Sequence, residues 1–409
     1  MRRAVITGVG VVAPSGIGVQ DHWAATVDGE QRVGTISSFD ASGYGTQLAG
    51  QVSGFDPADY IDGRIIVQTD RWSWFSLAAT QLALRDGDYD PGAHDPYDTG
   101  VILASGSGGN EFGQREIAGL WENGPSAVGA YQSIAWFYAA STGQISIEHQ
   151  AKGPSGVLVA EAAGGVDSLA QARRVIRRGT GAVLAGGTEA GITPYALTCQ
   201  MTNGRLTSAT SPERGYKPFD VAANGYAPGE GGAVLLVEDA DRAEDRSAPN
   251  IYGEIVGYGA THDAHDHHRA APDSHYYELA MRKSLDDAGL RPEDIDVVYA
   301  DGAGTAELDS LELTALRAVF GHREVRVPVT APQGLIGRLT AGGSALNVVN
   351  SLLSLRDGVI PAIGNLDTPV PSDGLDLVQT PRQVPVRVAM INSRGYGGFN
   401  SSLIVHAAA

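Results

Sequence analysis

Five histidines that lie close together in the sequence could supply ligands for a metal ion, because imidazole and carboxylate groups both bind zinc and similar ions. Two aspartates are interleaved with them. Their spacing is not the helical spacing that would place two ligands on one face and direct them at one ion. We therefore expect a polar surface loop and no metal site. The residues concerned are His262, Asp263, His265, Asp266, His267, His268 and His275.

Cys199 is the only cysteine of the chain and therefore its only thiol nucleophile. It lies in a mostly apolar stretch, residues 196–201, whereas a reactive thiol needs an electropositive pocket. We expect Cys199 to be buried and to serve packing. A single cysteine also excludes an intramolecular disulfide and suits a reducing cytoplasm.

Residues 8–13 fit the G-x-G-x-x-A form of a dinucleotide fingerprint, in which glycines let the backbone approach a pyrophosphate at the start of a helix. Residues 14–16, Pro-Ser-Gly, follow where that helix should begin. We therefore expect a glycine-lined strand. A Rossmann oxidoreductase remains an alternative that Pro14 weakens.

Short apolar runs alternate with segments of helical periodicity, which is typical of an α/β fold whose sheets are covered by helices. The charged stretch 238–250 is the best candidate boundary between two halves. The predicted strands are residues 5–7, 100–103, 182–185, 233–237, 295–299 and 386–391, and the predicted helices are residues 72–84, 166–176, 276–288, 308–320 and 345–355.

Composition excludes several classes of protein. The chain has 409 residues, of which 43% are hydrophobic, and a net charge of −18. This balance excludes a disordered chain, and the acidity argues against nucleic acid or an anionic membrane surface as a partner. No apolar run approaches the roughly 18 residues of a transmembrane helix. The short apolar start, residues 4–10, favours a buried strand over a signal peptide.

Several glycine-rich segments carry information through their order along the chain. They resemble the β-ketoacyl synthases of the thiolase fold across nearly the whole sequence. The resemblance implies a five-layered α-β-α-β-α arrangement of two duplicated halves, residues 1–244 and 245–409, and no cofactor. The matching segments are residues 5–10, 153–155, 185–190, 218–220, 225–232 and 392–400.

Such synthases use a cysteine nucleophile, two histidines and a lysine. The resemblance places Ala162 at the cysteine position, Asp301 and Arg338 at the two histidine positions, and Gln333 at the lysine position. A methyl group cannot form a thioester, and an ionised aspartate repels an enolate. We therefore expect no condensation by this subunit alone, which argues against a self-sufficient ketosynthase. We hypothesise that the aspartate and the arginine form an ion pair that fills the site.

Three segments are similar to the chain length factor, the β subunit of the ketosynthase heterodimer in bacterial type II aromatic polyketide synthases. They are residues 136–147, 159–165 and 300–304. That family commonly carries glutamine where Ala162 stands, and the glutamine amide is associated with malonyl decarboxylation. Alanine offers no amide, so we do not expect a priming decarboxylase role here.

The resemblance implies a catalytic ketosynthase α subunit as partner. The partner's cysteine would hold a poly-β-ketone that grows by malonyl units from an acyl carrier protein bearing phosphopantetheine. The chain would enter an interface tunnel whose far end this subunit closes. The gating positions hold Asn110, Gly113, Ile117 and Tyr195, which leave room for a decaketide or longer. The alternative is that these residues simply pack, in a scaffold subunit without length control.

The partner interface is expected to include Trp136, Phe137, Tyr138 and Ile145, because their segment is aromatic, apolar and uncharged. The alternative is that the segment is core.

The net charge of −18 disfavours direct docking of an acidic carrier protein, so carrier recognition is expected mainly through the partner. Four arginines form either a local basic patch for the carrier or an ordinary exposed helix face. They are Arg173, Arg174, Arg177 and Arg178.

Overall fold

The computed structural model describes residues 2–408, and its long strands form two halves of one mixed sheet. The first half has the order β6-β5-β7-β8-β1 and the second has the order β11-β10-β15-β16-β9, with β13 added at its edge. The strands of the first half are β1 (Ala4–Ala13), β5 (Thr99–Ala104), β6 (Ser155–Leu158), β7 (Ala182–Ala190) and β8 (Glu230–Asp239). Those of the second half are β9 (Gly253–His262), β10 (Val297–Tyr299), β11 (Val327–Thr330), β13 (Leu375–Leu377), β15 (Val388–Gly395) and β16 (Phe399–His406).

The two halves repeat one topology. If the five long strands of each half are numbered along the chain, both halves have the spatial order 3-2-4-5-1. In both, the second strand pairs in parallel with the third and the fourth, and the fifth pairs antiparallel with the fourth and the first. The halves join where β1 pairs with β9 over only two residue pairs.

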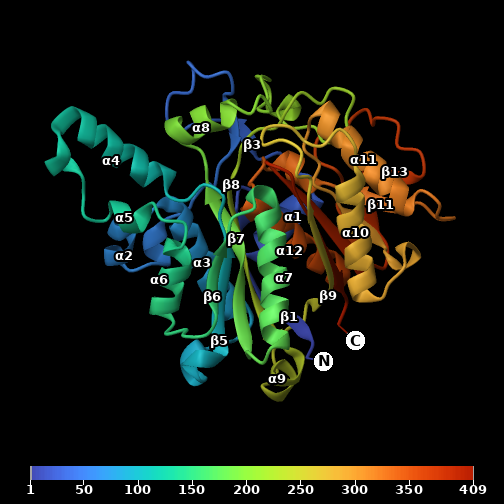
Figure 1. The fold of residues 1–409 in the computed structure, drawn as a ribbon, viewed down its shortest axis with the longest axis horizontal. Coiled ribbons are helices and arrows are strands. Elements are labelled where there is room, and N and C mark those ends of the chain that lie inside the picture. Colours follow the sequence, from blue (N-terminus) through green and yellow to red (C-terminus); the bar gives the residue numbers. More distant parts are fainter. Residues whose placement is uncertain (1, 409) are drawn as a thin grey trace.

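Helices form three layers around these two half-sheets. The helices α7 (Gly164–Arg177) and α12 (Ala341–Asp357) pack against each other between the half-sheets. On the outer side, α3 (Arg71–Asp86) covers the first half-sheet, while α10 (His275–Ala288), which packs with α11 (Ala306–Phe320), covers the second. Figure 1 shows this sequence of layers from α3 through α7 and α12 to α10 and α11. The predicted α-β-α-β-α arrangement is confirmed.

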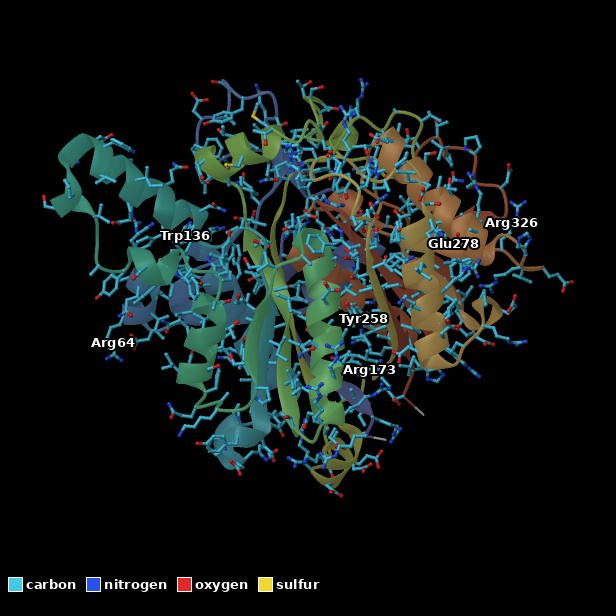
Figure 2. All side chains as sticks on the ribbon, viewed as in Figure 1. Arg64, Trp136, Arg173, Tyr258, Glu278 and Arg326 are labelled. Carbon is cyan, nitrogen blue, oxygen red and sulfur yellow. The ribbon has the colours of Figure 1, made fainter. Side chains whose placement is uncertain are left out.

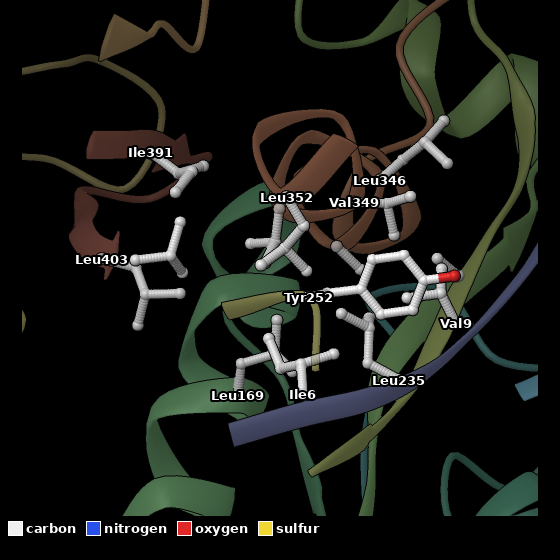
Figure 3. Close-up of a cluster of buried hydrophobic side chains, with 14 of the residues drawn as sticks. Ile6, Val9, Leu169, Leu235, Tyr252, Leu346, Val349, Leu352, Ile391 and Leu403 are labelled. Carbon is white, nitrogen blue, oxygen red and sulfur yellow. The ribbon is translucent and has the colours of Figure 1, made fainter. Parts of the chain in front are cut away.

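The central core joins both halves. Ile6 of β1, Leu169 of α7, Leu235 of β8, Leu352 of α12 and Leu403 of β16 belong to one buried cluster (Figure 3). Each large apolar side chain buried there contributes about 1.5–3 kcal/mol to the free energy of unfolding. The two central helices therefore hold the half-sheets together, although the strands themselves barely pair across the join.

The segment that fits a dinucleotide fingerprint is strand, as predicted, because residues 8–13 lie within β1. Its glycines allow α3 to pack very closely. A Cβ atom at Gly8 or Gly10 would collide with the carbonyl oxygen of Ala83 or Ala79, respectively. The glycines thus serve strand–helix packing, and no helix begins where a pyrophosphate would need one.

Shorter elements complete the chain. The predicted boundary after residue 244 falls in the last turn of α9. Among residues 2–408, we find no helix with the length and apolar character needed to cross a membrane. The remaining helices are α1 (Val19–Val27), α2 (Gly63–Gln68), α4 (Asn110–Asn123), α5 (Gln132–Ala135), α6 (Ala140–Glu148), α8 (Pro194–Met201) and α9 (Ala240–Asp245). The remaining strands are β2 (Gly16–Ile17), β3 (Val33–Thr35), β4 (Leu48–Gly50), β12 (Val359–Ile360) and β14 (Arg382–Gln383).

Candidate functional site

The four residues at the expected catalytic positions come together in the structure. Ala162 precedes α7, Asp301 follows β10, and Gln333 and Arg338 precede α12. All four line one small cavity of about 20 Å³, roughly the space that one water molecule needs. The four residues therefore share one site, as the resemblance to β-ketoacyl synthases implied.

Backbone conformation marks this place as unusual. Glu161 before α7 and Thr340 before α12 are non-glycine residues with positive φ, 49° and 48° respectively. Such conformations cost about 1–3 kcal/mol each and persist only where the surrounding structure holds them. The carboxylate of Glu161 accepts a hydrogen bond of 2.9 Å from the backbone N–H of Tyr396, which fixes the entry to α7.

Asp301 and Arg338 form the hypothesised ion pair. Both terminal nitrogens of Arg338 donate to the Asp301 carboxylate, each at 3.2 Å, and the side chains are only 11% and 8% exposed. Arg338 Nη2 also donates to the backbone carbonyl of Arg394 at 3.0 Å, and the Arg394 N–H donates to Asp301 Oδ1 at 3.1 Å. Burial lowers the pKa of Arg338, but the charges of Asp301 and Glu161 outweigh it and hold that pKa well above its usual value.

Gln333 takes up the lysine position with a neutral amide. Its Nε2 donates to the backbone carbonyls of Ala300 and Asp301, at 2.9 and 2.7 Å. Its Oε1 accepts a longer bond of 3.4 Å from Asn347. Gln333 therefore ties the end of β10 to the segment before α12.

Two buried carboxyl groups on α11 accept hydrogen bonds from the backbone of the segment that bears Asp301. Glu312 accepts hydrogen bonds from the backbone N–H groups of Asp301 and Gly302, both at 2.8 Å. Burial, reinforced by the charge of Asp301, raises the pKa of Glu312 to about 8. Asp309 accepts from the N–H of Gly304 at 3.0 Å, and burial raises its pKa to about 7. Sequence reasoning missed both residues; the available signal was two acids three positions apart on the buried face of a predicted helix.

The histidine cluster is not part of this site. The stretch from His265 to His268 is an exposed loop, as predicted, whereas His262 ends β9 and His275 begins α10. Asp263 is buried and accepts from Arg394 Nη2 and Asn400 Nδ2, both at 2.7 Å. Within residues 2–408, no three histidine, cysteine, aspartate or glutamate side chains form a group able to hold a metal ion.

The four expected gating residues lie on two helices that pack against each other. Asn110, Gly113 and Ile117 share one face of α4, and Tyr195 lies in the first turn of α8. The Tyr195 N–H donates to Gln114 Oε1 at 2.7 Å, which ties α8 to α4. A Cβ atom at Gly113 would lie 3.1 Å from the Trp136 ring.

The expected interface residues divide into two groups. Trp136 and Phe137 are 46% and 55% exposed, and Tyr138 is half-buried. Ile145 is fully buried in a core cluster beneath α6, where no other chain can reach it, so its assignment to the interface was wrong.

Two further expectations need correction. Cys199 is exposed and not buried, because α8 lies on the surface and presents this side chain outward. The four arginines of α7 and its end do not form one exposed face. Arg174 and Arg178 are exposed and Arg177 is half-buried, whereas Arg173 is buried, because it pairs with Asp287 and donates to the carbonyl of Val256.

Comparison with known proteins agrees with this geometry. The chain matches the beta-ketoacyl synthase N-terminal domain over residues 1–243 and the C-terminal domain over residues 252–367. It therefore belongs to the beta-ketoacyl synthase family.

Among its relatives is the tetracenomycin polyketide synthase ketoacyl synthase beta subunit of Streptomyces glaucescens. The two are 47% identical over 98% of this chain and 97% of that protein. A 3-oxoacyl-[acyl-carrier-protein] synthase 2 of Coxiella burnetii is 33% identical over 99% and 98%. The solved ishigamide ketosynthase/chain length factor superposes over 100% of both chains with a TM-score of 0.92 and 26% identity. Within its family, the chain is thus a homologue of polyketide ketosynthase beta subunits.

The first prediction concerns the ion pair. Arg338→Leu leaves the Asp301 carboxylate buried without its cation, so we expect the free energy of unfolding in urea to fall by about 3–5 kcal/mol. The double variant Asp301→Asn/Arg338→Leu removes both charges and should recover most of that loss. The matched control is Arg291→Leu at an exposed ion pair, with an expected loss below about 1 kcal/mol. Strictly additive losses in the double variant would show that the two groups are not coupled.

The second prediction concerns pH. The pKa of Glu312 is about 8 in the folded chain against an ordinary 4.5, so the unfolded chain loses this proton first as the pH rises. The contribution of the Glu312 proton to the free energy of unfolding is complete below about pH 4.5, and it is lost as the pH rises through about 8. Urea unfolding at several pH values should show this decline, with a shallower slope for Glu312→Gln. Glu307→Gln, at an exposed position of the same helix, is the control. An unchanged slope in Glu312→Gln would contradict the assignment.

Proposed function

We propose that this chain is the non-nucleophilic subunit of a ketosynthase heterodimer that shapes the polyketide tunnel and sets chain length in aromatic polyketide biosynthesis. The observation that carries the proposal is the site itself. Alanine and a buried Asp–Arg pair stand where condensation by this family needs a nucleophile and two histidines. The Streptomyces relative named as a ketoacyl synthase beta subunit supports the same assignment.

The chemistry of the site supports inactivity in condensation when the subunit is alone. The Ala162 methyl group has no lone pair with which to accept an acyl group. Arg338 is a cation, but its terminal nitrogens already donate to Asp301 and to the Arg394 carbonyl, so they are not aimed at a developing oxyanion. The acyltransferase chemistry therefore belongs to the complex, and the partner must supply its nucleophile.

The surface beside β6 supports pairing with a catalytic ketosynthase α subunit. β6 is the edge strand of the first half-sheet, and both Ser155 and Gly156 are exposed. An open edge strand can be extended by a strand of another chain. Large apolar side chains are exposed directly after β6 and on the helical segments from α4 to α6 that precede it in the chain, and obligate partners bury such surface. They are Trp121, Ile134, Trp136, Phe137, Ile147 and Val159.

The gating positions support a long product. Asn110, Gly113 and Ile117 carry side chains smaller than an aromatic ring, and the helix that bears them, α4, packs against α5, which ends next to Trp136. Overfilling a packed cavity costs about 1–3 kcal/mol, so the size of these side chains would limit how far a chain extends. We propose a decaketide or longer chain on this ground.

The alternative is a degenerate ketosynthase that stabilises its partner without controlling length. One observation favours it: Gly113 packs against Trp136 of its own chain, so the gating positions could serve packing alone. In either case, the net charge of −18 supports carrier-protein docking mainly through the partner.

The strand order and the cysteine content support two further proposals. The repeated strand order supports two halves, residues 1–244 and 245–409, related by duplication. One free cysteine and no disulfide-capable pair support work in a reducing cytoplasm.

The third prediction tests length control. Gly113→Trp adds a large ring at the expected tunnel end, so the polyketides should become shorter. The measurement is mass spectrometry of products made with the native ketosynthase subunit, an acyl carrier protein and a malonyl donor. Gly119→Trp adds the same ring at a half-buried position of α4 and should leave the carbon count unchanged. An unchanged carbon count with Gly113→Trp in an intact heterodimer would reject length control and leave the scaffold alternative.

A further inference from the structure

A basic groove lies between α7, β9 and α10. We define it by its charged lining residues, Arg173, Arg174, Arg177, Lys283 and Asp287, and it encloses about 350 Å³. Figure 2 shows Arg173 and Tyr258, which also lines the groove, between α7 and α10. Four cations face one anion here, although the chain as a whole carries a charge of −18.

Most of this positive charge is uncompensated. Arg173 pairs with Asp287, which uses the only acidic group of the lining. In the part of the chain that the structure describes, no ion pair involves Arg174, Arg177 or Lys283, and Arg174 donates only to the neutral amide of Gln171. Burial lowers the pKa of Arg177 and the adjacent positive charge of Arg173 lowers it further, while the charges of Asp287 and Glu254 oppose this shift without reversing it. The charged side chains that line the groove therefore carry an excess of three positive charges, four cations against one anion.

Buried hydrogen-bond donors without acceptors also indicate that the groove binds a ligand with oxygen atoms. The side chain of Arg173 is only 6% exposed, and its Nε has no hydrogen-bond partner. The buried Nε of Arg177 has none either. A buried donor without an acceptor costs about 1–3 kcal/mol, and more when it is charged, so a ligand with oxygen acceptors would relieve this cost.

The groove lies on the same side of the chain as the open edge strand. α7 connects the parallel strands β6 and β7 and so runs back along them, which places its arginine-bearing end level with the exposed start of β6. In Figure 1, α7 lies on the near side of the molecule beside β5, β6 and β7. The groove thus opens on the same side of the chain as the surface that we assign to the partner subunit.

A second copy of this chain does not fit the groove well. If the axis of a two-fold symmetric contact passes close to the groove, the groove faces its own copy, and two patches of uncompensated cations repel each other. The exposed apolar side chains near β6 do not distinguish a copy from another protein. Discrimination between the two must therefore come from charge.

We propose that the basic groove binds a carboxylate-bearing segment of the catalytic ketosynthase subunit and so favours the mixed dimer over self-association. The inference rests on the proposed function, since it takes that subunit as the partner. Carboxylates would accept from Arg174, Arg177 and Lys283, the three lining cations that form no ion pair within residues 2–408.

The test measures the dissociation constant of the heterodimer with the native ketosynthase subunit at low and high salt. The variant Arg174→Glu/Lys283→Glu reverses two exposed charges, so we expect the fold to persist and the dissociation constant to rise about tenfold or more at low salt. The difference should shrink at high salt, because exposed charges are screened. Arg178→Glu is the matched control, since Arg178 is exposed at the same end of α7 but does not line the groove.

Each outcome decides one claim. A heterodimer that forms equally well with the double variant would overturn this inference and leave the proposed function intact. Failure of the unaltered chain to bind the ketosynthase subunit would reject the proposed function itself. Inorganic phosphate that binds the unaltered chain but not the double variant, with an unchanged dissociation constant for the ketosynthase subunit, would assign the groove to small anions instead.

Discussion

The buried ion pair between Asp301 and Arg338 is the interaction on which the rest of the structure depends. It lies where the end of β10, the end of β15 and the segment before α12 meet, so it joins three elements of the second half. Desolvating two charges is costly, and their attraction repays that cost only when the remaining donors and acceptors are satisfied. The backbone of Arg394 and the carboxyl group of Glu312 provide those bonds around the pair. The pair is thus held by hydrogen bonds from the elements around it.

The duplicated architecture explains why the site lies where it does. α7 and α12 are corresponding helices of the two halves, and their first turns approach each other through glycine. A Cβ atom at Gly165 of α7 would collide with the carbonyl oxygen of Ala341 in α12, and one at Gly342 of α12 would collide with that of Gly231 in β8. This close approach brings Ala162 and Arg338, which lie 176 positions apart in the sequence, to one cavity. The same scaffold therefore supports an active synthase or an inactive one, depending on a few side chains at the helix entries.

Much of the fold could be predicted from the sequence, because buried strands and amphipathic helices carry strong periodic signals. All five predicted helices exist, and the six predicted strands coincide wholly or partly with strands of the structure. β9 was not predicted, because its glycines, Gly257 and Gly259, dilute the apolar pattern. Those glycines are needed where α10 packs closely, since a Cβ atom at either would collide with a backbone carbonyl of that helix. α4 was missed because its sequence is polar and interrupted by Gly113 and Gly119.

The site was predictable in part. The four positions expected to share one site followed from the family resemblance, and the ion pair followed from their chemistry. The supporting acids, Asp309 and Glu312, were missed although both lie in a predicted helix, because their spacing marks one helix face but not the backbone N–H groups that they accept from. Exposure was the weakest inference. Ile145 and Cys199 both lie in apolar stretches, yet one is core and the other is surface, and only tertiary packing decides between them.

The most direct test of the central claim is a condensation assay with malonyl-loaded acyl carrier protein, read by mass spectrometry. This chain, its Ala162→Cys variant and the ketosynthase subunit are each assayed alone, and then the chain and the ketosynthase subunit are assayed together. We predict products only from the two subunits together, and none from Ala162→Cys alone, because the Asp301–Arg338 pair still occupies the site. Condensation of malonyl units by the unaltered chain alone would contradict the account.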